Sequence, residues 1–96
     1  IMKTRFRLGQ IVMTRAINDD IADNSKFAKE ILECLGRYAN ADFSDMEHQE
    51  DIDMNIAAIE NGNDRIFATY NTCLGKIYII TEWDRSVTTI LYPEDY

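Results

Sequence analysis

Side chains that could do chemistry gather in two stretches of this sequence. The first, "DMEHQEDIDMN", runs from residue 45 to residue 55 and holds the chain's single histidine, His48, among carboxylates. The second runs from Glu82 to Ser86 and holds two acids, an arginine and a serine. Carboxylates bind hard metal ions or transfer protons, and a serine beside a histidine base is a nucleophile. Metal binding, acid–base hydrolysis and nucleophilic attack are therefore the chemistries to weigh.

A calcium loop is the metal site closest to the first stretch. Asp51, Asp53 and Asn55 match its first three ligands. The sixth position is Ile56, where that loop needs glycine, and the twelfth is Gly62, where it needs a bidentate glutamate. The apolar spacing of this stretch is also helical, which points the three side chains in different directions. We therefore predict no metal site and no cofactor.

The catalytic combinations are equally weak. His48 lies in the most acidic part of an expected helix and reads as a solvated side chain. Cys73 lies in an expected turn, where no neighbour in the sequence would lower its pKa. The pair Glu82 and Asp84 does not indicate a hydrolase, because paired carboxylates are common in so acidic a chain. No glycine-rich phosphate loop or dinucleotide fingerprint is present. We predict that the protein is not an enzyme and has no catalytic residue, with a small hydrolase or nuclease as the least favoured alternative.

The length of 96 residues predicts a single domain over 1–96. Charge is spread unevenly along this domain. The net charge is −7, yet residues 1–15 carry four basic residues and no acid. Residues 16–64 carry thirteen acids against Lys26, Lys29 and Arg37. Such a field repels nucleic acid and attracts basic surfaces. We expect a basic protein partner and no direct contact with nucleic acid.

The expected compartment is the cytoplasm. No apolar run reaches the length of a membrane span, and the start lacks the apolar core and cleavage site of a secretory signal. Cys34 and Cys73 are far apart and lack metal-like spacing, so two reduced thiols are favoured over one disulfide.

The first half of the chain predicts one strand and two main helices. A strand is expected over Phe6–Thr14, with Gly9 as a bulge, followed by a short helical turn over residues 16–24. A helix over Ser25–Tyr38 follows, capped at Asn24 or Ser25. Its buried row should consist of Phe27, Ile31, Cys34, Leu35 and Tyr38.

The second main helix is expected to carry most of the acidity. A capping box from Ser44 to Glu47 should open it, and Gly62 should end it after about Glu60. Its expected buried residues are Met46, Gln49, Ile52, Ile56 and Ile59. Its acids are Glu47, Glu50, Asp51, Asp53 and Glu60.

The last third predicts three strands, Arg65–Tyr70, Lys76–Glu82 and Val87–Tyr92, joined by short turns into an antiparallel meander. The segment from residue 83 to residue 86 then becomes a hairpin loop, and Pro93 with its acidic tail blunts the last strand against edge pairing. The predicted fold class is α+β, with the helices on one sheet face.

The other sheet face is expected to be rich in tyrosine and isoleucine. Alternation groups Phe67 with Ile77, Ile79, Val87, Thr89 and Leu91, and Ile66 with Tyr70, Tyr78, Ile80, Ile90 and Tyr92. Neither group is polar enough to be a plain solvent face. An uncovered face of this kind is typical of an interface, while cover by the N-terminal segment or a strong sheet twist is an equal alternative.

The C-terminal segment "KIYIITEWDRSVTTILYPEDY" resembles the closing signature of a small family of hypothetical proteins from plasmids, prophages and integrated elements. In that family the pattern is TExDRSxTTILxPExY, which this chain matches from Thr81 to Tyr96. The segment "ADFSDMEHQEDIDMNIAAIENGNDRIFATY" is also similar to the family. The departures are Asn63, an extra residue in one turn, and Phe43-Ser44 where a tryptophan–glycine pair is expected.

What the resemblance implies is a mobile-element protein without an assigned reaction. Small acidic proteins from such elements inhibit host defence systems, CRISPR effectors or restriction enzymes, by covering a basic nucleic-acid channel. Helix-spaced carboxylates suit that role because they occupy sites built for phosphates, although an ordinary solubilising surface is the alternative. The leading hypothesis is a non-enzymatic binding protein, and the alternative is a homodimeric accessory protein that associates through the sheet face. The expected partner-binding residues are Glu47, Glu50, Asp51, Asp53, Glu60, Tyr78, Ile80 and Tyr92.

Overall fold

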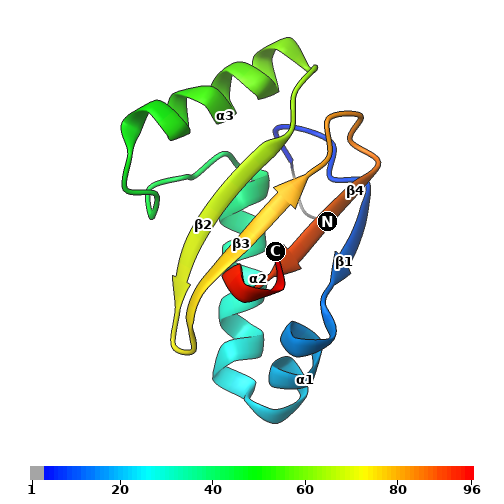
Figure 1. The fold of residues 1–96 in the computed structure, drawn as a ribbon, viewed down its shortest axis with the longest axis vertical. Helices are drawn as coiled ribbons and strands as arrows, with labels where there is room; N and C mark the ends of the chain where they lie inside the picture. Colours follow the sequence, from blue (N-terminus) through cyan, green and yellow to red (C-terminus); the bar gives the residue numbers. More distant parts are fainter. Residues whose placement is uncertain (1–3) are drawn as a thin grey trace.

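An antiparallel meander of β2 (Ile66–Thr72), β3 (Gly75–Thr81) and β4 (Val87–Leu91) forms the centre of the fold (Figure 1). A short strand, β1 (Gln10–Met13), adds to β4 in parallel, which gives the strand order β1-β4-β3-β2. The structure is a computed structural model that describes residues 4–96, and Lys3 of the basic start lies outside them. The predicted α+β class and the meander are confirmed.

β1 is shorter than the predicted strand because Gly9 redirects the chain. Gly9 has a φ of 65°, in the left-handed region, and is a turn residue ahead of the strand rather than a bulge within it. A Cβ added there would lie 2.3 Å from the carbonyl oxygen of Ser86. Glycine is therefore needed where the β3–β4 hairpin loop touches the entry to β1.

Two helices follow β1. α1 (Arg15–Asp23) is a full helix rather than the predicted short turn, and the Thr14 side chain accepts a hydrogen bond from its first turn. α2 (Ser25–Ala39) is confirmed, with the Asn24 side chain accepting from the backbone N–H of Phe27 at 3.0 Å. Its predicted buried row is also confirmed: Phe27, Ile31, Cys34, Leu35 and Tyr38 are all buried.

α3 (Gln49–Asn61) begins later than predicted. The capping box is wrong because Ser44 lies in the connector, where its hydroxyl donates to Asp42 at 2.6 Å. The predicted end is confirmed: Gly62 is left-handed and its N–H donates to the carbonyl oxygen of Ala58 at 2.8 Å. Ile52, Ile56 and Ile59 pack on the core as predicted, together with Met46, but Gln49 is exposed.

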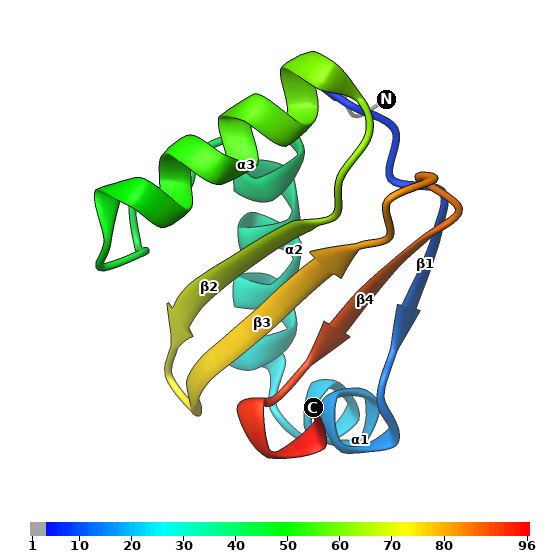
Figure 2. The ribbon, with the colours of Figure 1, turned by 45° about the horizontal axis from the view of Figure 1, so that its top comes forward.

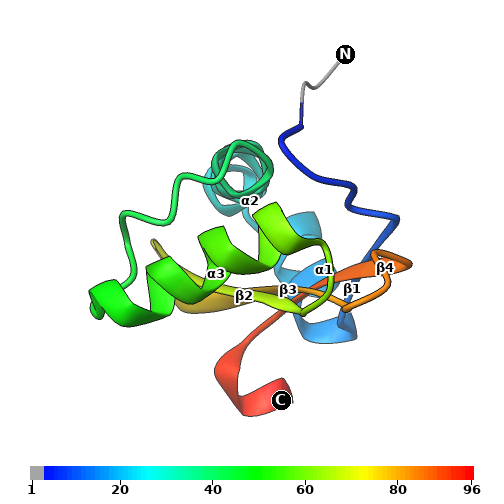
Figure 3. The ribbon, with the colours of Figure 1, turned by 90° about the horizontal axis from the view of Figure 1, so that it is seen from above.

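α2 crosses one face of the sheet, whereas α3 runs beside the outer edge of β2, close to the level of the sheet (Figures 2 and 3). Of the two main helices that were predicted to cover one face, α2 lies across that face and α3 packs against its edge. The turn η1 (Pro93–Asp95) folds to the opposite side, where Tyr96 packs edge-on against Phe67 and Tyr78. Pro93 blunts no edge, because β4 lies between β1 and β3.

The grouping of side chains by sheet face was wrong for one strand. Ile77 and Ile79 lie on the helix-covered face beside Ile66 and Ile90, whereas Tyr78 lies on the other face with Phe67. Alternation specifies the two faces of each strand, but the relation between strands depends on the register set by the turns. A two-residue turn pairs Thr72 with Gly75 and sets that register.

A chain of buried hydroxyls crosses the helix-covered face. The Tyr38 hydroxyl lies 2.6 Å from the Thr81 hydroxyl, which lies 2.7 Å from the Thr88 hydroxyl. Thr88 donates to the carbonyl oxygen of Leu8 at 2.6 Å. Burial raises the pKa of Tyr38 well above its usual value, so this row of hydroxyl groups stays uncharged. These bonds tie α2, β3, β4 and the segment before β1 together.

Candidate functional site

The acidic helix α3 is anchored to the sheet by a buried amide. The Asn55 side chain donates to the carbonyl oxygen of Phe67 at 2.8 Å and accepts from its N–H at 3.1 Å. In an antiparallel strand both backbone groups of a residue face the same side, so these bonds occupy the outer edge of β2. Asn55 therefore pairs with β2 as a neighbouring strand would.

The far end of α3 is held by the β3–β4 hairpin loop. The Arg85 guanidinium donates to the carbonyl oxygen of Ala58 at 2.9 Å and to that of Asp64. A cation at the C-terminal end of a helix also complements the helix dipole. Arg85 itself has a φ of 60°, which closes the hairpin turn. The loop that looked catalytic in the sequence fixes the exit from α3.

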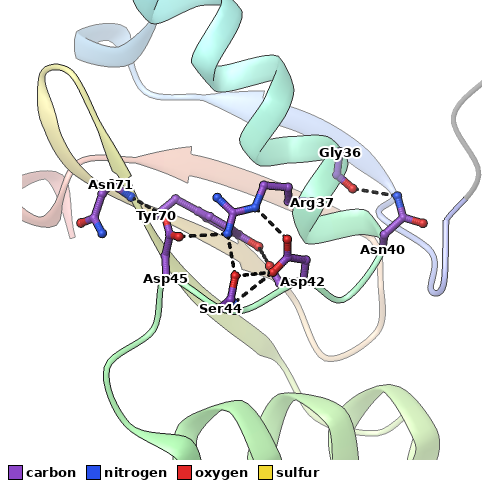
Figure 4. Close-up of polar contacts among 8 residues, drawn as sticks. All are labelled: Gly36, Arg37, Asn40, Asp42, Ser44, Asp45, Tyr70 and Asn71. Atoms are coloured by element: carbon purple, nitrogen blue, oxygen red, sulfur yellow. Dashed lines mark hydrogen bonds and ion pairs between the residues drawn. The ribbon is translucent and has the colours of Figure 1, made fainter.

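The connector ahead of α3 is organised by Arg37, which binds three side chains (Figure 4). Its guanidinium lies 2.9 Å from carboxylate oxygens of both Asp42 and Asp45, and it donates to the Ser44 hydroxyl at 3.0 Å. It also lies over the Tyr70 ring, 5.1 Å from its centre. Hydrogen bonds from Arg37 hold the pKa of both carboxyls below their usual range.

This cluster is structural in character because its groups are engaged with one another and with the backbone. The second oxygen of Asp45 accepts from the N–H of Asn71 at 3.0 Å, on the outer edge of β2. Tyr70 donates to the carbonyl oxygen of Asp42, and Asn40 donates to that of Gly36. The cluster sets where the chain enters α3.

The five predicted acids separate into two rows around α3. Residues three, four and seven apart share a side of a helix. Glu47, just ahead of α3, and Asp51 face β2, and Glu47 lies 3.8 Å from Lys76. Glu50, Asp53 and Glu60 lie on the outward side and are exposed. No ion pair reaches these three carboxylates within residues 4–96.

A groove of about 530 Å³ lies between α3 and the outer edge of β2. Met54 and Phe67 supply apolar lining, and Glu47, His48 and Lys76 supply charged or polar groups. His48 thus lies beside carboxylates and methionines, without a serine or cysteine nucleophile in the lining. In the part of the chain that the structure describes, no cluster of three or more histidine, cysteine or acidic side chains is arranged to hold a metal.

The sheet-face residues named from the sequence do not all share a face. Tyr78 and Ile80 lie on the face opposite the helices, where Ile80 is already buried. Tyr92 is on the helix side: its ring stacks on Phe27 and its hydroxyl donates to Asp20. Tyr92 therefore belongs to the core on the side of α2 rather than to the sheet face that Tyr78 and Ile80 share.

The roles of Asn55, Arg37 and Arg85 in positioning α3 were not predicted from the sequence. For Asn55 there was a signal, because it lies three residues from Ile52 and next to Ile56 in the apolar row. A polar residue in a buried row needs a partner. Arg37 and Arg85 gave no comparable signal, since their partners are brought together only by the fold.

Comparisons with protein-family models, with curated proteins and with solved structures gave no match to this chain. Among the helices of residues 4–96, none has the length and apolar character needed to cross a bilayer.

Proposed function

We propose that this protein is a non-enzymatic binding protein that docks the acidic side of α3 on a basic protein surface. The observation that carries the proposal is the outward row of Glu50, Asp53 and Glu60, which lacks ion-pair partners within residues 4–96. The row is held rigidly, because Asn55 fixes the helix to β2 and Arg85 fixes its end. Because the helix that carries these carboxylates is already held in place, docking on a basic surface costs little backbone freedom, which favours binding.

The partner that fits this row is a protein that handles nucleic acid. A row of carboxylates can occupy a channel lined by lysine and arginine, which otherwise binds phosphates. The resemblance of residues 81–96 to a plasmid and prophage family favours a host defence system, CRISPR or restriction, as the target. The protein would then act as an inhibitor in the cytoplasm, through protein contact alone.

The first test is affinity capture from nuclease-treated bacterial lysate at low and high salt, read by mass spectrometry. The wild type should capture a basic nucleic-acid-handling protein at low salt and lose it at high salt, because screening weakens exposed charge contacts. A variant with Glu50→Gln, Asp53→Asn and Glu60→Gln should capture at least tenfold less of that partner than the wild type.

A control variant with the same charge change separates the α3 row from net charge. Glu33→Gln, Glu82→Gln and Glu94→Gln neutralise three exposed acids elsewhere and should leave capture unchanged. Equal loss in both variants would show that net charge alone drives capture. Capture of no other protein by the wild type would remove the proposal.

The second candidate function is that of a homodimeric accessory protein, favoured by the sheet face opposite α2, where η1 and Tyr96 leave Phe67 and Tyr78 partly exposed. Tyr78, Phe67 and Tyr96 form an aromatic cluster there, with ring centres 4.8 to 6.2 Å apart. If two copies associate through this face, Tyr78→Glu should abolish a doubled mass.

A further inference from the structure

The outer edge of β1 presents backbone groups without partners. Gln10 donates its N–H to Ser86 and Thr14 donates its N–H to Ile90, so alternate residues of this segment face β4. The intervening residues, Ile11 and Met13, must direct their N–H and C=O groups away from β4. Within residues 4–96 these groups have no hydrogen-bond partner outside the β1–β4 ladder.

The side chains on this edge are apolar and accessible. Ile11 is 40% exposed and Met13 is 41% exposed. β1 contains no proline and no charged residue, which are the usual devices that keep a sheet edge from pairing.

The opposite edge of the same sheet is protected. On β2, the Asn55 side chain binds both backbone groups of Phe67, and Asp45 accepts from the N–H of Asn71. The fold therefore closes one edge with side chains from α3 and its connector and leaves the other ready to pair.

We propose that β1 pairs in antiparallel fashion with β1 of a second copy of this chain, so that the two sheets become one. This interface goes beyond the proposed function and is separate from α3. A two-fold axis at Val12 sets Ile11 opposite Met13 of the second copy, and each such pair exchanges N–H···O bonds in both directions. The exposed Ile11 and Met13 side chains become cross-strand neighbours.

Charge favours a second copy over an unrelated strand. Antiparallel pairing brings the segment before β1 in one copy alongside α1 in the other. That segment carries Arg5 and Arg7, and α1 carries Arg15 in its first turn and Asp19, Asp20 and Asp23 after it, so the two segments have opposite net charges. Arg5, Arg7, Asp19 and Asp23 are exposed, and none of them forms an ion pair within residues 4–96. The pairing sets opposite charges together at both ends of the joint ladder.

The test is the mass in solution of three purified chains, measured by sedimentation equilibrium across a range of concentrations. The wild type should reach twice its 11.1 kDa monomer mass. Met13→Lys introduces a charge on the β1 edge and should weaken association at least tenfold. Met54→Lys makes the same change at an exposed methionine of α3 and should leave the doubled mass intact.

A backbone variant keeps the test decisive if Met13→Lys fails to fold. Ile11→Pro removes an N–H that points away from β4, a position where a strand tolerates proline, so the monomer should fold while association is lost. Amide hydrogen exchange gives a second measurement: the Met13 N–H should be protected in the wild-type dimer and unprotected in the Ile11→Pro monomer, and the Ile11 N–H should lose its protection in Met13→Lys.

Three results would overturn the proposal. The wild type could stay a monomer at its highest soluble concentration. Met13→Lys and Ile11→Pro could both fold and keep the doubled mass. Tyr78→Glu could abolish a doubled mass that both edge variants keep, which would assign the interface to the open sheet face.

Discussion

At the scale of single residues, side chains that look chemical in the sequence position α3. Asn55 binds the backbone of Phe67, and Arg85 binds the carbonyl oxygen of Ala58. Both contacts leave a donor or acceptor without a partner if the side chain is removed, which costs about 1–3 kcal/mol for a buried group. They give the acidic row of α3 a fixed direction.

The tight contact at Gly9 predicts that alanine is destabilising there but not at Gly36. Gly9→Ala should lower the free energy of unfolding by more than about 1 kcal/mol, since φ is positive and the added Cβ would meet the Ser86 carbonyl at 2.3 Å. Gly36→Ala, in α2 with no atom within 4 Å of the added Cβ, should instead raise it by about 0.5–1 kcal/mol. Urea unfolding followed by circular dichroism measures both changes, and similar stability in the two variants would contradict this packing of the loop on Gly9.

The surroundings of Asn55 show which features of the acidic helix could be predicted from residue types alone and which could not. Four of the five acids could be placed on one helix from the sequence, because helical spacing is a local property; the fifth, Glu47, lies just ahead of α3. The division into an outward row and a groove-facing row could not be predicted, since it depends on which side of α3 meets β2. Asn55 decides that side through two hydrogen bonds.

At the scale of elements, local signals predicted α2 and the meander closely, and tertiary contacts shifted the rest. α2 has a cap at Asn24 and an unbroken apolar row, both of which are local properties. α3 starts at Gln49 because Arg37 engages Ser44 and Asp45 in the connector, so the predicted capping box never forms. The prediction assigned the side chains of β3 to the wrong faces of the sheet, because alternation within one strand does not determine its register with the neighbouring strands.

The connector predicts a specific dependence of stability on pH. The pKa values of Asp42 and Asp45 are lowered in the folded state, chiefly by hydrogen bonds from Arg37. A lowered folded pKa means that the stabilisation is complete above the ordinary carboxyl pKa and is lost as pH falls through the folded pKa. The thermal midpoint should therefore fall as pH drops from about 5 to about 2.

Asp45→Asn tests the cause of that fall. The variant should be less stable than the wild type at pH 7 and should lose less further stability on acidification, because one of the two linked carboxyls is gone. Glu33→Gln, at an exposed acid without an ion pair in residues 4–96, should keep the wild-type pH profile. Identical profiles in Asp45→Asn and the wild type would show that the Arg37 cluster does not govern acid stability.

At the scale of the whole molecule, different surfaces are assigned to different partners. The net charge of −7 is concentrated in the middle of the chain, and α3, which lies along one side of the fold (Figure 2), carries part of it as the exposed row of Glu50, Asp53 and Glu60. The β1 edge lies at the other end of the strand order. A dimer formed through β1 would leave both copies of α3 accessible and present two acidic rows to a partner, so avidity would raise its apparent affinity.

Competition with nucleic acid on the partner isolated by affinity capture tests most directly whether the acidic row of α3 occupies a nucleic-acid channel. The partner's binding of its own DNA or RNA is measured by fluorescence anisotropy while this protein is titrated in at low salt. The wild type should displace the nucleic acid, and the Glu50→Gln, Asp53→Asn, Glu60→Gln variant should need at least tenfold more protein. If the wild type binds the partner and its nucleic acid stays fully bound, the acidic row of α3 does not occupy a nucleic-acid channel.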